Sequence, residues 1–334
     1  MLGQALSGMQ IRLLNATAVR ALLPVKNCTA LMRQAMSLGA TTATIQPIRQ
    51  ALYHPDRRGL LSMMPGYTGN PEWLGIKVMT VFPGNFGTAL GSHQGFVHLF
   101  DTTNGAPRAI LDGREITAIR TAAATAVATD VLAPPSASTL AIFGYGEQAR
   151  THLEAVTQVR QFDRALVWGR DLARAKQFAA AESAHYDFEI TAVATAEEAA
   201  AADVLCTTTA AKEPFFEGRW LRPGHHLNVV GSSIPTTSEI DVATVAKARM
   251  FVDFKDSALA LAGDFRRAKE AGVVGDDHIL GTIGDVLTGR VIGRTSDRDI
   301  TLFKSLGMVA EDLVAADFIL REAERQGVGQ LIDW

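Results

Sequence analysis

The chain has 334 residues, of which 47% are hydrophobic and 20% are charged, and its formal net charge is −3. This length is sufficient for two domains with separate cores, and the near-neutral charge argues against nucleic-acid or anionic-membrane binding. Two distant cysteines, no secretion-signal pattern in 1–14 and no run of about 18 apolar residues predict a soluble cytoplasmic protein without disulfides or membrane spans.

The first 130 residues read as a mixed region of helices and strands. Residues 18–40 have a helical composition, and apolar stretches separated by turn residues predict strands within 44–53, 59–67, 73–83 and 95–113. The sequence Asn-Gly-Ala-Pro at 104–107 indicates a hairpin turn inside the last of these stretches. Residues 115–133 then form a predicted helix rich in alanine, which would let another backbone approach closely.

The pattern changes after Pro134 and Pro135, which disfavour both helix and sheet. From there to about residue 254, apolar strands alternate with helices, which is typical of a parallel, doubly wound sheet. A further helix is predicted over 306–327, long enough to return to the first domain. We therefore expect an α/β protein in which a dinucleotide-binding Rossmann domain (131–305) is inserted in an α+β dimerisation and substrate domain (1–130 plus 306–334).

The clearest motif is a glycine-rich turn between a predicted strand and a predicted helix. It contains Gly144, Gly146 and Ala149 in the G-x-G-x-x-A form of the dinucleotide fingerprint, with Gln148 inside it. The first glycine permits the tight turn, the second lets the backbone approach a pyrophosphate, and the alanine lets helix and strand pack closely. The helix N-terminus would then receive the phosphates.

The end of the next predicted strand bears on the choice of cofactor. Proteins specific for NAD usually place an acid there, whereas this chain has Arg170 followed by Asp171. An arginine can pair with the 2′-phosphate of NADP, so NADP is favoured within an NAD(P) assignment. The alternative is an exposed arginine beside a helix that Asp171 caps.

Three basic residues lie in apolar or small-residue surroundings: Arg49, Lys77 and Arg120. Lys77 stands in the middle of an apolar strand, where burial is costly unless an anion is paired with it. The alternatives are an exposed strand face or a snorkelling stem for Lys77, a structural ion pair for Arg120 and a surface position for Arg49.

Taken together, these stretches resemble the ornithine cyclodeaminase/mu-crystallin family. The similarity runs over nearly the whole chain, including 144–149, and is most specific in 74–85 and 100–128 in combination. It implies a homodimer whose active site lies between the two domains, with Arg49, Lys77 and Arg120 binding the α-carboxylate of a small amino or imino acid. It further implies that the cofactor is contacted by Thr121, Thr207, Thr208, Val230 and Ser305. For the hydroxyl groups among these residues, the alternative is a capping or main-chain hydrogen bond within the protein.

Members of this family catalyse different reactions, and residues 228–241, NVVGSSIPTTSEID, bear on the choice. Cyclodeaminases and alanine dehydrogenases of the family carry an aspartate where this chain has Ser233, whereas mu-crystallin-like reductases have serine. Handling water, ammonia or a distal amine benefits from a carboxylate, and reduction of an imine needs less acid–base help. Ser233 therefore favours NAD(P)H-dependent reduction of a cyclic imino acid, such as pyrroline-2-carboxylate or piperideine-2-carboxylate.

Several alternatives remain open at this stage. His93 would contact a second carboxylate if it pointed into the site, which would suit an iminosuccinate reductase forming aspartate. An alanine-dehydrogenase-like enzyme, an ornithine cyclodeaminase and a non-enzymatic binding protein are the other possibilities. The pair His225 and His226 has no accompanying ligand pattern, so no metal is expected. Cys206 lies in an apolar strand and is expected in the core.

Overall fold

The computed structural model describes residues 9–88 and 90–334, so the stretch 1–14, where no secretion signal is expected, lies partly outside them. The chain divides into two compact units. The described residues up to Arg120 form the first unit together with Met308–Trp334, and Thr121–Gly307 form the second. Within the described ranges, no helix is both long enough and apolar enough to cross a membrane.

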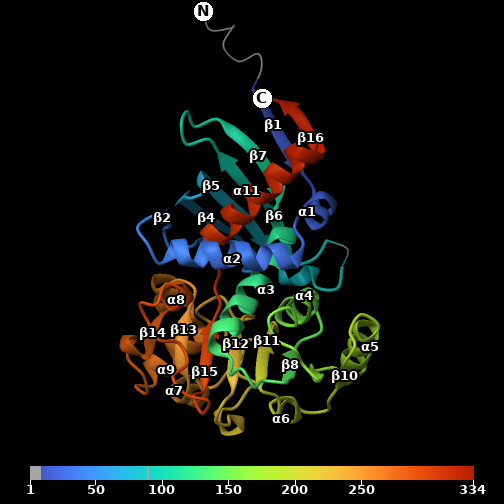
Figure 1. The fold of residues 1–334 in the computed structure, drawn as a ribbon, viewed down its shortest axis with the longest axis vertical. Helices are drawn as coiled ribbons and strands as arrows, with labels where there is room; N and C mark the ends of the chain where they lie inside the picture. The colour runs from blue at the N-terminus through green and yellow to red at the C-terminus, as the bar shows by residue number, and fades with distance from the viewer. Residues whose placement is uncertain (1–8, 89) are drawn as a thin grey trace, which may run out of the picture. The chain divides into compact units, whose positions relative to one another are not determined.

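The first unit is built on a sheet of eight strands, in the order β16-β1-β7-β6-β5-β4-β2, with β3 paired to β4 (Figure 1). All neighbours are antiparallel except β1 and β7. The strands are β1 (Gln10–Leu14), β2 (Thr44–Ile45), β3 (Gln50–Tyr53), β4 (Leu60–Gly69), β5 (Glu72–Val81), β6 (His93–Phe100), β7 (Pro107–Asp112) and β16 (Gln330–Asp333). The helical elements of this unit are α1 (Ala16–Leu22), α2 (Val25–Gly39), the 3₁₀ turn Pro83–Asn85, the start of α3 (Gly113–Leu132) and α11 (Val309–Gln326).

Helix α11 packs directly on strands β4, β5 and β6. The close approach is made by Gly66 of β4 and Gly75 of β5, which lie opposite each other in the ladder. A Cβ atom at Gly66 would collide with the side chain of Val309, and one at Gly75 with that of Leu313. Two paired glycines therefore provide the groove that receives the first half of α11.

The second unit is a sheet of eight parallel strands, in the order β10-β9-β8-β11-β12-β15-β13-β14. The strands are β8 (Thr139–Phe143), β9 (Arg164–Trp168), β10 (Glu189–Ala192), β11 (Val204–Thr207), β12 (His226–Val229), β13 (Arg249–Val252), β14 (Ile279–Thr282) and β15 (Thr301–Lys304). The helices are α4 (Glu147–Val156), α5 (Leu172–Ser183), α6 (Ala196–Ala199), α7 (Val242–Lys247), α8 (Lys255–Leu261), α9 (Gly263–Glu270) and α10 (Ile283–Leu287), with 3₁₀ turns at Gly218–Trp220 and Asp276–His278.

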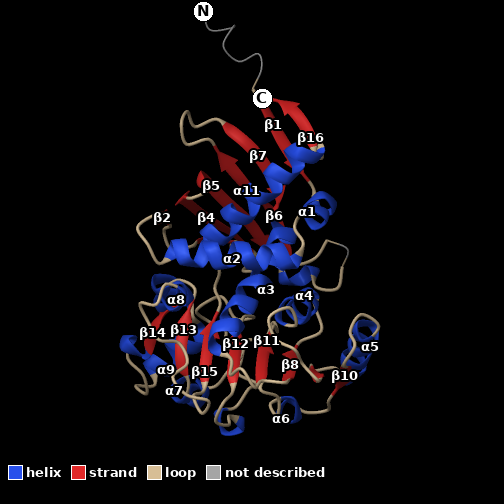
Figure 2. Ribbon diagram, viewed as in Figure 1, coloured by secondary structure: helices blue, strands red, loops and turns tan. Residues whose placement is uncertain are grey.

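Helices cover both faces of this parallel sheet (Figure 2). In β8, Leu140 and Ile142 point into a core formed with α4 and α5, and Ala141 and Phe143 point into a core formed with α6 to α9. Successive residues of a strand face opposite sides, so an apolar run such as this one requires cover on both faces. The expected α/β fold with a doubly wound parallel sheet is confirmed.

The end of the second unit differs from the sequence-based expectation. Residues 301–304 form β15, which inserts between β12 and β13, and α11 begins at Val309 rather than 306. The helix starts later because the carboxylate of Asp253 accepts hydrogen bonds from the main-chain N–H groups of Leu306 and Gly307. Gly307 also has a φ of +82°, which is incompatible with a right-handed helix.

Candidate active site

The glycine-rich turn has the local geometry that a dinucleotide fingerprint requires. Gly144 follows β8 with a φ of +133°, and a Cβ atom there would lie 2.7 Å from the hydroxyl of Thr208. Gly146 is the N-cap of α4, and a Cβ atom on it would meet nothing within 4 Å. Ala149 is fully buried in the core shared by α4 and β8. The exposed main chain of Gly146 at a helix N-terminus is the feature that receives phosphate in such folds.

Two of the predicted cofactor residues, one in α3 and one in α4, have polar atoms available. The hydroxyl of Thr121 and the amide oxygen of Gln148 are buried and have no hydrogen-bond partner among the described residues. Buried polar atoms are rarely left unsatisfied, so a bound polar group would remove this cost. The unpaired polar atoms of Thr121 and Gln148 therefore fit a bound cofactor, and this observation does not depend on the glycine motif.

At the end of β9, Arg170 is exposed and Asp171 caps helix α5. The carboxylate of Asp171 accepts a hydrogen bond of 3.1 Å from the main-chain N–H of Arg174. Arg174 in turn lies over the ring of Tyr145, 4.7 Å from its centre. Asp171 therefore caps as the sequence suggested, and Arg170 is an accessible positive charge directly after β9.

The remaining predicted cofactor residues gather at the carboxyl ends of β11, β12 and β15. Thr207 is buried, and its hydroxyl donates to Glu239 at 2.7 Å, while that of Thr208 donates to the carbonyl oxygen of Phe143 at 3.1 Å. Both hydroxyls therefore have structural partners, as the capping alternative anticipated. Val230 and Ser305 are buried beside them. In an open parallel sheet, ligands bind outside this edge of the strands.

The two serines after β12 have different environments. Ser232 is buried and donates a hydrogen bond of 2.6 Å to the carbonyl oxygen of Thr237, whereas Ser233 is half-buried. Ser232 therefore fixes the turn, and Ser233 is the serine of this pair with access to a ligand.

In the first unit, Lys77 and Arg120 meet two acids of α11. The ammonium of Lys77 lies 2.7 Å from Oδ1 of Asp312, and the same oxygen accepts from Nε of Arg120 at 3.1 Å. Nη1 of Arg120 donates to Glu311 at 2.9 Å. All four side chains are at most 5% exposed. The structural ion pair considered for Arg120 is thus present, and the exposed alternative for Lys77 is wrong.

The sequence reasoning missed Glu311 and Asp312. Both could have been recognised by the pattern that identified Lys77, because they are charged residues inside an otherwise apolar run. Burial, followed by the charge of Arg120, lowers the pKa of Lys77 to about 8, and Asp312 opposes this change. Arg49, half-buried just before β3, also lowers the pKa of Lys77, so its charge lies close to the group. A lysine that titrates near neutral pH can both bind a carboxylate and donate a proton.

The other candidates take no part in this arrangement. His93 is exposed at the start of β6, and its partner in the ladder, Val81, lies four residues from Lys77 along β5. The ring of His226 is buried between Thr301 and Asn228, and burial lowers its pKa to about 3. Cys206 is in the core as expected. Within 9–88 and 90–334, no cluster of three or more His, Cys, Asp or Glu residues could hold a metal ion, and the absence of a metal stays a prediction.

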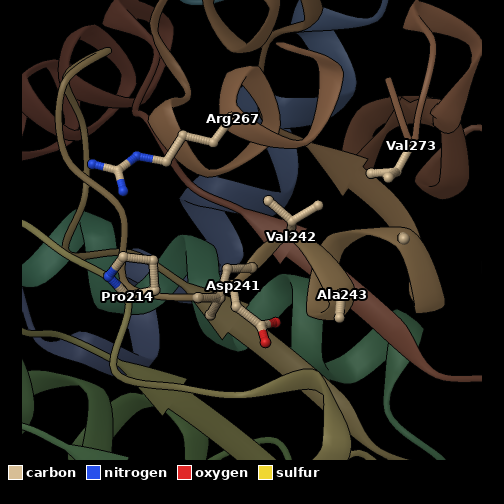
Figure 3. A pocket seen from close by; sticks show the side chains of 8 residues that line it. Pro214, Asp241, Val242, Ala243, Arg267 and Val273 are labelled. Carbon is tan, nitrogen blue, oxygen red and sulfur yellow. The ribbon is translucent and has the colours of Figure 1, made fainter. Parts of the chain in front are cut away.

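A cavity elsewhere in the second unit does not contain the predicted residues (Figure 3). Its polar side chains are already used, because Asp241 caps α7 and Arg267 forms an ion pair of 2.6 Å with Glu213. The rest of its lining is apolar or small. The cavity therefore offers no group for chemistry.

The model of the ornithine cyclodeaminase/mu-crystallin family matches residues 9–327. The chain belongs to this family. The mouse protein named ketimine reductase mu-crystallin is 36% identical over 284 residues, covering 85% of this chain and 87% of that protein. A Delta(1)-pyrroline-2-carboxylate reductase of Bacillus cereus is 34% identical, and the match covers 96% of this chain and 99% of that protein.

The fold of this family member is also similar to that of a solved structure. The Delta(1)-pyrroline-2-carboxylate reductase of Thermococcus litoralis, in complex with NADH and L-proline, has a TM-score of 0.93 and 34% identity. The match covers 96% of this chain and 99% of that chain. The family resemblance inferred from the sequence is confirmed, and it extends through both units.

Proposed function

We propose that this family member reduces the C=N bond of a cyclic imino acid with NAD(P)H, converting pyrroline-2-carboxylate or piperideine-2-carboxylate to the amino acid. The observation that carries the proposal is the turn after β12. It presents Ser233, and the nearest acid along the chain, Glu239, is buried and accepts hydrogen bonds from its own unit. No carboxylate of residues 230–239 is thus available for handling ammonia or water, whereas imine reduction needs none.

We assign each site residue a role in substrate binding, proton donation or cofactor binding. Lys77, Arg120 and Arg49 bind the substrate carboxylate, and charge-assisted hydrogen bonds of about 1.5–3 kcal/mol each orient the neighbouring carbon. Lys77 can supply the proton that the nitrogen needs, and Ser233 orients that nitrogen or a water molecule. A bound reduced nicotinamide supplies the hydride. The cofactor is held by the main chain at Gly144 and Gly146, and further contacts come from Gln148, Arg170, Thr121, Thr208, Val230 and Ser305. The fully buried Ala149 and Thr207 support these contacts through helix packing and the hydrogen bond to Glu239.

A cofactor-oxidation panel tests this function. NADH and NADPH are each combined with pyrroline-2-carboxylate, piperideine-2-carboxylate, oxaloacetate plus ammonia, or pyruvate plus ammonia. We expect a cyclic imine to give a kcat/KM at least about 10-fold above the open-chain mixtures, a typical discrimination by pocket fit. Fastest turnover with oxaloacetate plus ammonia would instead support iminosuccinate reduction, and with pyruvate plus ammonia an amino acid dehydrogenase. Rapid release of ammonia from ornithine with NAD would overturn the role given to Ser233.

Arg170 is the residue on which the proposed preference for NADP depends. Changing Arg170→Asp removes the positive charge after β9 and adds a negative one, so the ratio of kcat/KM for NADPH over NADH should fall by about 10-fold or more. The matched control is Arg164→Asp at the other end of β9, which should leave the ratio unchanged. An unchanged ratio in the Arg170 variant would remove this residue from the cofactor site.

We also propose a homodimer that buries the free face of the first unit's sheet. Helix α11 covers one face of β4 to β6, and the alternate residues on the other face are largely apolar, including Leu74 at 47% and Phe96 at 38% exposure. Exposed apolar surfaces of this kind are typical of subunit interfaces. The native mass by light scattering should be twice that of the chain, and Phe96→Lys should shift it toward the monomer. A monomeric parent protein would contradict this proposal, and the cytoplasmic location stays a prediction.

A further inference from the structure

One lysine is completely buried in the parallel sheet of the second unit. Lys304 is the last residue of β15, and its side chain is 0% exposed. Burying an ammonium group is costly unless it is paired and hydrogen-bonded. Its Nζ lies 3.0 Å from Oδ2 of Asp264 and donates a hydrogen bond to the main-chain carbonyl oxygen of Ser232. The lysine therefore connects the end of β15 to the turn that follows β12.

A second buried charge lies close to it. Glu239 is fully buried, and burial raises the pKa of its carboxyl, an effect that the charge of Lys304 counteracts. This carboxylate accepts four hydrogen bonds of 2.7 Å each, from the hydroxyl of Thr207, the N–H and hydroxyl of Thr209 and the N–H of Gly231. One side chain thus joins the ends of β11 and β12. A Cβ atom at Gly231 would collide with the carbonyl oxygen of Thr209, so the two chain segments approach more closely than any residue other than glycine would permit.

Asp264 completes the arrangement from the first turn of α9. Its Oδ1 accepts hydrogen bonds from the hydroxyl of Ser238 at 2.7 Å and from the N–H of Glu239 at 2.8 Å. It therefore holds the segment that carries Glu239 and is paired with Lys304 through its other oxygen. We refer to Glu239, Asp264 and Lys304 as the strand-end cluster.

The strand-end cluster lies where the proposed cofactor residues are found. Thr207 donates to it directly, Ser305 follows Lys304, and Ser233 follows the residue whose carbonyl Lys304 binds. A doubly wound sheet consists of two mononucleotide-binding halves. The strands β8 to β10, with Arg170, form the half expected to take adenosine. The strands β11, β12 and β15 belong to the other half, which takes the nicotinamide end.

We infer that Glu239, Asp264 and Lys304 are positioning residues for hydride transfer, which hold the ends of β11, β12 and β15 so that Ser233 and the neighbouring hydroxyls meet the nicotinamide half of the cofactor. This inference rests on the proposed function. A network of buried, hydrogen-bonded and paired charges is more rigid than a single hydrogen bond. A displacement of the reacting groups by about 1 Å can reduce the rate of a catalysed step by about 100-fold. A rigid cluster at the carboxyl ends of these strands would prevent such a displacement.

The test compares ligands with and without nicotinamide. Glu239→Gln keeps the volume of the side chain but replaces an acceptor oxygen by a donor. We expect kcat to fall by about 10- to 100-fold and the affinity for NAD(P)H, measured by fluorescence titration, to weaken. The affinity for ADP-ribose or its 2′-phosphate, which lack nicotinamide, should change less than about twofold, because among the described residues no side chain of the cluster forms a hydrogen bond to Arg170 or to the turn at 144–146. Glu239→Asp, which retains the charge, should recover part of kcat.

The matched control is Asp203, whose carboxylate also joins two strands but at their amino-terminal ends. Oδ2 of Asp203 accepts hydrogen bonds from the N–H groups of Ser138 and Thr139 at 3.0 and 2.9 Å and so joins the starts of β8 and β11. Asp203→Asn should lower the melting temperature but leave kcat and both affinities unchanged. If Glu239→Gln fails to fold, Thr209→Val removes one donor without changing charge and should show the same pattern to a smaller degree.

The outcomes separate this inference from the proposed function. Unchanged kcat in Glu239→Gln, or an equal loss of affinity for NAD(P)H and ADP-ribose, would overturn the positioning role. If the parent protein reduced no imine in the panel, the proposed function would fail. The binding comparison would still test the inference in that case, because it requires no turnover.

Discussion

Replacing Lys77 by methionine is expected to lower kcat/KM for the imino acid by about 100- to 1000-fold, because one partner of a buried charge pair is removed. The change deletes the 2.7 Å contact with Asp312 and one cation of the proposed carboxylate site. Nucleotide affinity should be retained, since the residues proposed to bind the cofactor all lie within Thr121–Gly307. Initial rates across substrate concentrations and a titration with NAD(P)H measure the two effects. Normal turnover in this variant would remove Lys77 from the site.

The pH dependence of carboxylate binding provides the control for Lys77. Its pKa is lowered to about 8, so the ammonium is charged below that pH and loses its proton above it. The affinity for a planar carboxylate such as pyrrole-2-carboxylate, which does not titrate between about pH 6 and pH 10, should therefore weaken as the pH rises through about 8. Lys77→Arg keeps its charge over this range and should not show the decline. An identical decline in both proteins would assign the titration to another group.

Replacing Arg120 by methionine should affect stability as well as turnover. The substitution removes the cation that faces Glu311 and Asp312 at 2.9 and 3.1 Å and leaves their carboxylates buried. Breaking a buried ion pair in this way costs about 3–5 kcal/mol. We expect the melting temperature to fall by about 5–10 °C and imine reduction to drop at least about 100-fold.

A double variant separates the two effects of Arg120. Adding Glu311→Gln to Arg120→Met removes one of the buried negative charges, so part of the lost stability should return, whereas turnover should not. Recovery of turnover together with stability would mean that Arg120 has only the structural role that its ion pairs suggest. Thermal unfolding and steady-state rates on the same samples distinguish these results.

The sequence predicted the conformation of the glycine-rich turn well because its parts are contiguous. Gly144, Gly146 and Ala149 lie within one strand–turn–helix unit, and each glycine has a local physical reason. The caps of α4 and α5 and the alternation of strands and helices are local in the same sense. Such features depend on neighbours a few residues away, which the sequence shows directly.

The surroundings of Lys77 were predicted only in part. An apolar strand around Lys77 indicated that a buried ammonium needs an anion, but the sequence did not show which one. Asp312 lies 235 residues further along the chain, and only the packing of α11 on β5 brings the two together. The paired glycines Gly66 and Gly75 make that packing possible, and their joint role becomes visible only when the two strands are in register.

In the turn of residues 230–237, too, some features follow from the sequence and others only from the fold. That this turn contains Ser232 and Ser233 and no acid follows from residue identity alone. The folded structure buries Ser232, leaves Ser233 partly accessible and brings Lys304 to the main chain of the turn, and none of these features could be read from the local sequence. The position of β15 between β12 and β13 sets this last contact, and strand order depends on long-range pairing that no local pattern contains.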